Sequence, residues 1–312
     1  MKKAGVRKSI HRTLGKPTGQ GAVRLGGKVF LYAFLCVTGF VFLYPLLKMI
    51  SMSFMTADDL VNPLVSWVPY GFEIANFTRA MQVLGYWQTL WTTVYVSVLP
   101  AILQTLVCAL TGYGIARYKF KGKNLLFGLI LATFIIPTQI TMIPQFLMYK
   151  NLGILYSLKA YLLPAVFGQG MRSAIFVLIF VLFFQQMPVS LTEAAEIDGA
   201  NQIVIFYKIA VPVAKPGFLI SFLLSMVWYW NETYLGALYF GANIKTLPMK
   251  LENFVEAFNK LVSASAADTG ATANEAIQMA GTFLIILPLL IVYFCLQRQF
   301  IEGIEKTGIT GE

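Results

Sequence analysis

Long apolar stretches alternate with shorter polar ones along this chain. Six apolar stretches begin near positions 29, 87, 125, 161, 218 and 276, and a helix of roughly 20 apolar residues can cross a bilayer. The pattern therefore predicts an all-α integral membrane protein with six spanning helices. Five of them have clear limits, at about 29–49, 87–114, 161–184, 218–239 and 276–296, and Pro100 is expected to break the second.

Prolines and polar residues interrupt the third and fourth apolar stretches. The third contains Pro137, Gln139, Pro144 and Gln145, and the fourth contains Pro164, Gly168, Gln169, Gly170 and Arg172. Such residues are tolerated at membrane depth where a segment lines a cavity or packs on protein. These two interruptions are the clearest sequence indication of a translocation path.

The segments outside the spans divide the chain further. Residues 1–28 are basic and lack an apolar period, which predicts a flexible cytosolic tail, and residues 29–296 form the membrane domain. Residues 51–85 are expected to be an external loop with one short helix near 77–84. Residues 241–274 form another loop, whose Ala/Ser/Thr-rich part, 263–273, is predicted to be flexible or weakly helical. Residues 297–312 are a second cytosolic tail.

The charge distribution indicates orientation rather than nucleic-acid binding. Hydrophobic residues make up 57% of the 312 residues and charged residues 12%, while the net charge is +10. Sixteen of the 24 Lys and Arg residues lie in the tails and inner loops, against six in the outer loops. Because basic residues accumulate on the cytoplasmic side, both termini are predicted to be cytosolic.

One polar, helix-forming segment separates the fourth and fifth spans. We call residues 188–217 the EAA segment. Ser190 to Glu193 fits a capping box, Gly199 can end a helix in the left-handed conformation, and a second short helix should stop at Pro212 and Pro216. On physical grounds alone, an amphipathic loop on the lipid surface explains this segment equally well.

Residue spacing favours a more specific interpretation of the EAA segment. Its sequence resembles the EAA loop of ATP-binding-cassette importer permeases, and most closely the carbohydrate-importer, maltose-type branch. Val211, where a Leu is usual, is a conservative departure, and the Arg298 to Gly303 turn is also similar to that branch. The resemblance is carried by Glu193, Ala194, Ala195, Asp198, Gly199, Ile209 and Pro212.

The resemblance implies a type I importer permease in a bacterial cytoplasmic membrane. Its EAA loop would be a coupling helix that docks into one of two separate ATPase subunits. A second, related permease chain would complete the pore, and an extracellular solute-binding protein would deliver a carbohydrate. The chain itself would not be an enzyme and would hold no cofactor, because ATP and Mg²⁺ would be bound by the ATPases.

Polar residues at membrane depth are the candidates for the substrate path. Trp228, Trp230, Asn231 and Glu232 combine aromatic faces with hydrogen-bonding groups, as sugar binding requires, although an aromatic belt with Glu232 at the outer water boundary is an alternative. Gly168, Gln169 and Arg172 form the second group. Arg172 either faces the substrate, extends to the interface, or pairs with Glu232.

No catalytic or metal-binding constellation is found in the sequence. The only histidine, His11, lies in the basic tail, and the three cysteines lie in apolar stretches, where they are expected to pack as small hydrophobic residues. Two alternative functions remain open at this point. One is a permease of the same superfamily for an amino acid, peptide or polyamine, and the other is a transporter that needs no ATPase.

Overall fold

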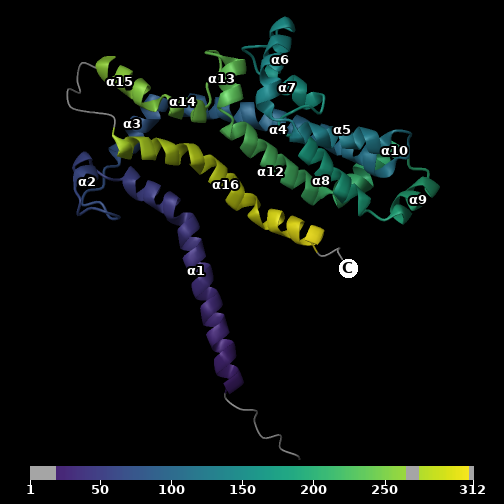
Figure 1. The fold of residues 1–312 in the computed structure, drawn as a ribbon, viewed down its shortest axis with the longest axis horizontal. Coiled ribbons are helices and arrows are strands. Elements are labelled where there is room, and N and C mark those ends of the chain that lie inside the picture. The colour runs from purple at the N-terminus through teal and green to yellow at the C-terminus, as the bar shows by residue number, and fades with distance from the viewer. Residues whose placement is uncertain (1–18, 265–273, 309–312) are drawn as a thin grey trace, which may run out of the picture. The chain divides into compact units, whose positions relative to one another are not determined.

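The structure is a computed structural model that describes residues 19–264 and 274–308 (Figure 1). All regular secondary structure in these two ranges is helical, which confirms the predicted all-α class. The chain divides into two compact units, residues 1–49 and 50–312, and each is described separately.

The first unit consists of most of helix α1 (Gly19–Ser53). Residues 27–53 of this helix are apolar enough to cross a membrane, as predicted. The helix begins at Gly19 rather than near Val29, so part of the predicted basic tail is helical. Residues 1–18 of that tail lie outside the described residues.

The helices of the second unit differ widely in length, from the short α11 to the long α4 and α16. The first part contains α2 (Ala57–Val61), α3 (Ala75–Leu84), α4 (Tyr86–Arg117), α5 (Lys123–Ile135), α6 (Thr138–Asn151), α7 (Lys159–Val166) and α8 (Ser173–Gln185). Then follow α9 (Val189–Ile197), α10 (Gln202–Ile205), the π-helix η1 (Phe206–Ala210), α11 (Val211–Val213) and α12 (Lys215–Asn231). The last part contains α13 (Tyr234–Phe240), α14 (Leu247–Glu252), α15 (Phe254–Ala264) and α16 (Glu275–Gly308).

Length and apolar composition give three to six candidate spans in the described ranges. Three helices qualify alone, namely α1, α4 and α16, and three bent helix pairs qualify only if each pair is counted as one span. The α3 helix confirms the short helix expected near 77–84.

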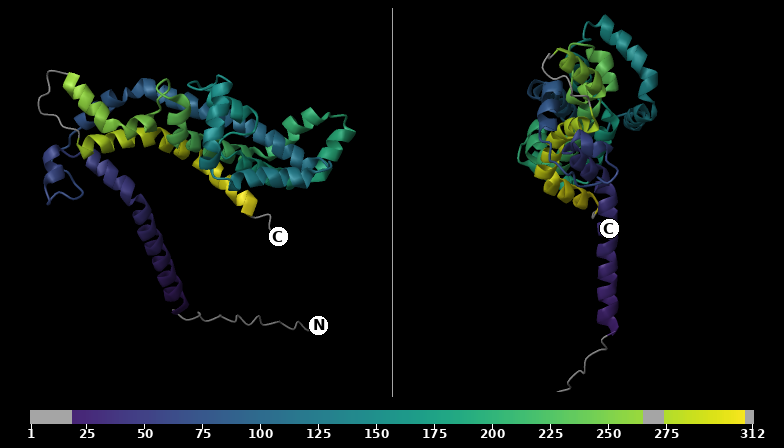
Figure 2. Two further views of the ribbon diagram at one scale, coloured as in Figure 1. Left: turned by 45° about the horizontal axis from the view of Figure 1, so that its top comes forward. Right: turned by 90° about the vertical axis from the view of Figure 1, so that its left-hand side faces the viewer.

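Helix α4 lies at the centre of the second unit. It packs against α8 and α12, and α12 in turn packs against α16 (Figures 1 and 2). Phe176, Phe180 and Phe184 of α8 are fully buried in this packing. A Cβ at Gly112 would lie 2.5 Å from Phe180 Cβ, so the absence of a side chain at Gly112 lets α4 and α8 approach closely.

Prolines predicted to break helices do so at only some positions. The chain bends by 100° between α5 and α6 at Pro137, as expected, and it breaks again between α7 and α8. Pro100, in contrast, lies inside the continuous helix α4, which corrects the predicted break. Pro100 is buried between packed helices, and such packing keeps a helix continuous across a missing backbone hydrogen bond.

Other boundaries also differ from the sequence prediction. The fifth predicted span ends at Asn231, and α13 follows as a separate helix. The loop 241–274 contains α14 and α15, while the predicted C-terminal tail continues α16 as far as Gly308. Residues 265–273 of the predicted flexible stretch lie outside the described residues.

Candidate functional site

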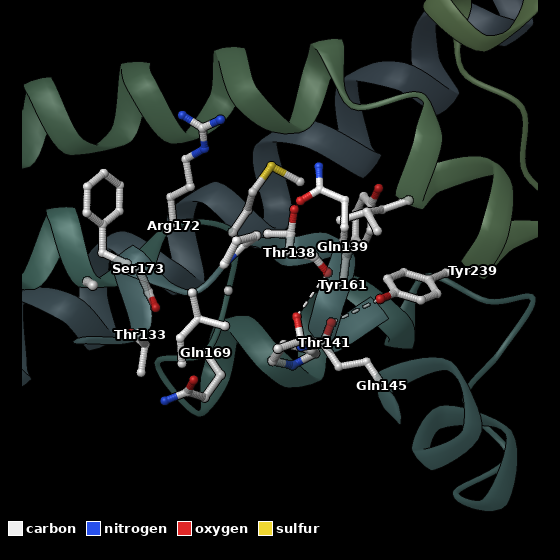
Figure 3. Close-up of a pocket in the computed structure, with 18 of the residues that line it drawn as sticks. Thr133, Thr138, Gln139, Thr141, Gln145, Tyr161, Gln169, Arg172, Ser173 and Tyr239 are labelled. Carbon is white, nitrogen blue, oxygen red and sulfur yellow. Dashed lines mark hydrogen bonds between the residues drawn. The ribbon is translucent and has the colours of Figure 1, made fainter. Parts of the chain in front are cut away.

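A cavity of about 560 Å³ opens where the two interrupted segments meet (Figure 3). Its walls come from the α5–α6 bend, from α7 and the start of α8, and from α12 and α13. Hydroxyl and amide side chains are frequent in this lining, and the one charged side chain in it is that of Arg172. The polar and aromatic lining residues include Thr133, Thr138, Gln139, Thr141, Gln145, Tyr149, Tyr161, Gln169, Arg172, Ser173, Tyr229 and Tyr239.

The α5–α6 bend supplies one polar wall. Pro137 adopts an extended conformation before α6, so the helix axis turns and brings Thr138, Thr141 and Gln145 toward the cavity. Tyr239 of α13 donates a hydrogen bond to Gln145 Oε1 at 3.1 Å, which ties α6 to α13 across the cavity. This bond fixes the α6 wall against a helix that is distant in sequence.

The break between α7 and α8 supplies the opposite wall. Gly168 takes a left-handed conformation with φ of 68°, which favours glycine. Gln104 of α4 is fully buried and donates through Nε2 to the Met171 carbonyl at 2.6 Å. Tyr229 donates to Gln104 Oε1 at 2.8 Å and accepts a bond from the Met171 amide at 3.1 Å. These three bonds hold the break in place.

Arg172 ends this break in a conformation that is rare for a residue with a side chain. Its φ is 52°, and it precedes the first residue of α8. Its guanidinium carbon lies 4.9 Å from the centroid of the Trp228 ring, and Figure 3 shows the guanidinium directed toward α12. The predicted alternative of an Arg172–Glu232 ion pair is not formed between these two described residues, because Arg172 lies over the Trp228 ring and Glu232 accepts from the Leu235 amide.

The predicted substrate-path residues are only partly brought together. Gln169 and Arg172 line the cavity, whereas Gly168 and the four residues predicted on the fifth span are not among the lining residues. Trp228 packs against Phe176, and Trp230 is buried in a different cluster, which includes Tyr86 and Leu284.

Asn231 and Glu232 bond locally at the end of α12. The Asn231 amide donates to the Val227 carbonyl, and Glu232 accepts from the Leu235 amide at 2.8 Å. The role of the group from Trp228 to Glu232 in sugar binding stays a prediction.

Tyrosines form the part of the lining that sequence reasoning missed. Tyr149, Tyr161, Tyr229 and Tyr239 come from four different helices and meet in one cluster. The Tyr161 hydroxyl is buried and has no hydrogen-bond partner within the described ranges. The Pro137–Gln145 interruption marked the α6 wall in the sequence, but no local pattern marked these tyrosines.

The EAA segment forms the predicted helix-turn-helix, with a different start. Helix α9 begins at Val189 with Pro188 as its N-cap, and no side-chain capping bond is present there. The predicted capping box of Ser190 and Glu193 is therefore wrong, because Ser190 already lies inside the first turn. Glu193, Ala194 and Asp198 are exposed, Ala195 is half-buried, and α9 contains no buried side chain.

The turn that follows α9 confirms the prediction for Gly199. Its φ is 80°, and the Ala200 amide donates to the Ala195 carbonyl at 2.9 Å, which closes the helix end. Asn201 then caps α10, since its side chain accepts from the Val204 amide.

The second limb of the EAA segment continues past Pro212. It runs as helix, partly in π geometry, from Gln202 to Val213, and bends by 76° into α12 near Ala214. The prediction that Pro212 and Pro216 stop this helix is confirmed, because the helix ends at Val213, between the two prolines. Ile209 is half-buried, while Ile205 and Phe206 are buried.

Comparison with known proteins identifies the class of this chain. The family profile described as "Binding-protein-dependent transport system inner membrane component" matches residues 108–306, which include all the residues that line the cavity and the whole EAA segment. The chain belongs to this family. It is therefore a permease component of a binding-protein-dependent transport system and a multi-pass membrane protein, and family membership implies solute-binding and ATPase partners.

Several curated permeases are similar over nearly their whole length. The arabinooligosaccharides transport system permease protein AraQ of Halalkalibacterium halodurans is 28% identical over 294 residues, which cover 90% of this chain and 98% of that protein. The lactose transport system permease protein LacG of Rhizobium radiobacter is 27% identical, with 87% and 93% coverage.

A solved structure shares the fold of this permease. It is a chain of a bacterial ABC transporter involved in the import of the acidic polysaccharide alginate. The TM-score is 0.74 at 22% identity, and the match covers 92% of this permease and all of that chain.

Proposed function

We propose that this permease forms half of the pore of an ATP-driven importer for a carbohydrate, in particular an oligosaccharide. The observation that carries the proposal is the cavity, where hydroxyl, amide and aromatic side chains meet at two breaks in spanning segments. Sugars need hydrogen-bonding groups for their hydroxyls and aromatic faces for their apolar side. The curated relatives named for arabinooligosaccharides and lactose support this substrate class.

The proposed topology has six spans and two cytosolic termini. Three of the spans are α1, α4 and α16, which qualify alone, and a fourth is the bent α5–α6 pair. We assign the other two to α7 with α8 and to α12. This arrangement puts the EAA segment on the cytosolic face, as the distribution of basic residues supports. The membrane would be the bacterial cytoplasmic membrane.

The proposed coupling uses the exposed face of α9. Glu193, Ala194, Asp198 and Gly199 are accessible and would dock into a cleft of an ATPase subunit. Two such ATPases would bind ATP and Mg²⁺, and a second, related permease would complete the pore. Closure of the ATPase pair would move α9 and switch the cavity between its inward- and outward-facing states.

Purification of the tagged permease from its native membrane tests the proposal. We expect two ATPase copies, one further permease, and ATP hydrolysis that a sugar-loaded binding protein stimulates. Recovery of the chain alone, even after cross-linking through residues 193–212, would contradict the proposal. If a loaded amino-acid-binding or peptide-binding protein stimulated ATP hydrolysis instead, the permease role would hold, but the proposed carbohydrate substrate would be excluded.

A cavity variant tests the site itself. In the reconstituted complex, Gln139→Leu should raise the sugar concentration that gives half-maximal transport by about tenfold, as loss of a hydrogen bond to a substrate predicts. Gln88→Leu is the matched control, because Gln88 is exposed and not part of the cavity lining. Equal half-saturation values for the two variants would exclude Gln139 from the substrate path.

A further inference from the structure

The direction of α9 is not fixed by a hydrophobic core. Helix α9 contains no buried side chain, and its axis is bent by 71° from that of α8. The second limb of the EAA segment differs, because Phe206 is buried and its ring centroid lies 5.0 Å from that of Tyr113 on α4. Apolar packing therefore anchors the second limb, and α9 needs another means of orientation.

Arg117, the last residue of α4, supplies two contacts to the start of α9. Its Nη1 donates to the Met187 carbonyl at 2.9 Å, and its Nη2 donates to Thr192 Oγ1 at 2.9 Å. These acceptors lie just before and within α9, so one planar guanidinium fixes both the origin and the rotation of the helix. A charged donor makes such bonds stronger than neutral ones. The cation also lies at the C-terminus of α4, where the helix dipole favours it.

A second chain of hydrogen bonds extends from the neighbouring residue and ends on the Glu196 carboxylate. Tyr118 donates to Gln202 Oε1 at 2.8 Å, and Gln202 Nε2 donates to Glu196 Oε1 at 2.8 Å. Glu196 and Gln202 lie on either side of the Gly199 turn. The end of α4 thus contacts both limbs of the EAA segment.

The same helix contacts the cavity wall at Gln104. Thirteen residues of continuous helix between Gln104 and Arg117 correspond to about 20 Å. Gln104 holds the Met171 carbonyl in the break before α8, as described above. A displacement of α9 that Arg117 passes to α4 would therefore reach the wall of the cavity without an intervening loop.

We infer that Arg117 is a positioning residue that orients α9 and transmits its displacement through α4 to the cavity wall. This role rests on the proposed function, since it requires that α9 is moved by an ATPase. Contact with both acceptors at once requires two hydrogen-bond donors in a fixed, forked arrangement, and the arginine guanidinium has such an arrangement. Lysine keeps the charge but cannot place two fixed donors 2.9 Å from both acceptors.

The test measures ATP hydrolysed per sugar transported, with the full transporter in proteoliposomes. Loss of a charge-assisted pair of bonds predicts that Arg117→Met raises this ratio about tenfold and that Arg117→Lys restores it only in part. Lys121→Met is the control, because it removes the same charge from an exposed position of the next loop and should leave the ratio unchanged. A role in charge alone predicts full rescue by lysine and would overturn the proposal.

A second variant keeps the test decisive if Arg117→Met fails to assemble. Thr192→Val removes the acceptor of one Arg117 bond, together with the local bond from the Thr192 hydroxyl to the Val189 carbonyl, with almost no change in shape. It should raise the ratio about threefold with normal assembly. In an Arg117→Lys background the same change should add less than it does alone, because the two residues share one interaction. A wild-type ratio for Thr192→Val would overturn the proposal.

The result also separates this inference from the proposed function. A wild-type complex that couples ATP hydrolysis to sugar uptake, with Arg117 variants at the wild-type ratio, would refute the role of Arg117 alone. A wild-type chain without any ATPase partner would refute the proposed function itself.

Discussion

The middle and the C-terminal end of helix α4 hold their neighbours in different ways. In the middle, Gln104 is fully buried and shares a closed set of hydrogen bonds with Tyr229 and the Met171 backbone. At the C-terminal end, Arg117 and the following Tyr118 are half-buried or exposed and contact the EAA segment through polar atoms. Changes near Gln104 should therefore affect folding, and changes near Arg117 should affect the movement of α9.

The largest stability effect is expected at Gly170. A Cβ there would overlap the Gln104 side chain and lie 2.7 Å from the Tyr229 hydroxyl, both held by buried hydrogen bonds. Gly170→Ala should lower the free energy of unfolding in detergent by about 3 kcal/mol, the upper range for overpacking. Thermal unfolding of the purified chain measures this change.

Gly114→Ala is the matched control at the other half of α4. No atom lies within 4 Å of the position that its Cβ would take, and alanine favours a helix over glycine. We expect a gain in stability of up to about 1 kcal/mol. If both substitutions changed stability in the same direction, the proposed difference between the middle and the C-terminal end of α4 would not hold.

The next effect is expected at Gln104. Gln104→Leu leaves the Met171 carbonyl without its donor and removes the acceptor of the Tyr229 hydroxyl, so stability should fall by about 2 kcal/mol. The double variant with Tyr229→Phe should lose less than the sum of the two single variants, because both act on one hydrogen bond. Additive losses in thermal unfolding would show that the network does not act as a unit.

A smaller effect is expected at Gly199 in the EAA segment. Its φ of 80° is costly for a β-branched residue, so Gly199→Val should lower stability by about 1–2 kcal/mol and reduce sugar-stimulated ATP hydrolysis. Asparagine adopts this conformation more readily, and Gly199→Asn should retain most of the hydrolysis. Equal hydrolysis by the Val and Asn variants would show that the left-handed turn is not needed for coupling.

Local sequence features predicted the fold at positions where the backbone preference of a single residue determines the conformation. Pro137 is exposed and separates two helices in the extended conformation, and Gly199 takes the positive φ that its position in the turn requires. Pro100 misled the prediction, since tertiary packing keeps α4 continuous around it. The Ser190 capping box also fitted the local pattern. In the structure, however, α9 already begins at Val189, after the bend that follows α8.

The cavity could be predicted only in part. Trp228 and Trp230 are close in sequence, yet two positions along a helix point in nearly opposite directions, so one packs toward α8 and the other toward Tyr86. Tyr149, Tyr161 and Tyr239 are distant in sequence and meet only through helix packing. A local pattern finds the breaks that open a cavity, but tertiary packing decides which side chains face it.

The smallest effect is expected at Tyr118, at the Arg117 end of α4. Tyr118→Phe removes the exposed bond to Gln202 and keeps the ring contact with Tyr113, at 6.0 Å between centroids. Stability should change by about 0.5 kcal/mol or less, because water replaces a lost partner at an exposed neutral site. The ratio of ATP hydrolysed to sugar transported should stay near the wild-type value, since Arg117 still holds α9. Thermal unfolding and the coupling assay measure both quantities. If Tyr118→Phe raised the ratio as much as Arg117→Met, the orientation of α9 would depend on the hydrogen bonds through Gln202 and not on the guanidinium fork.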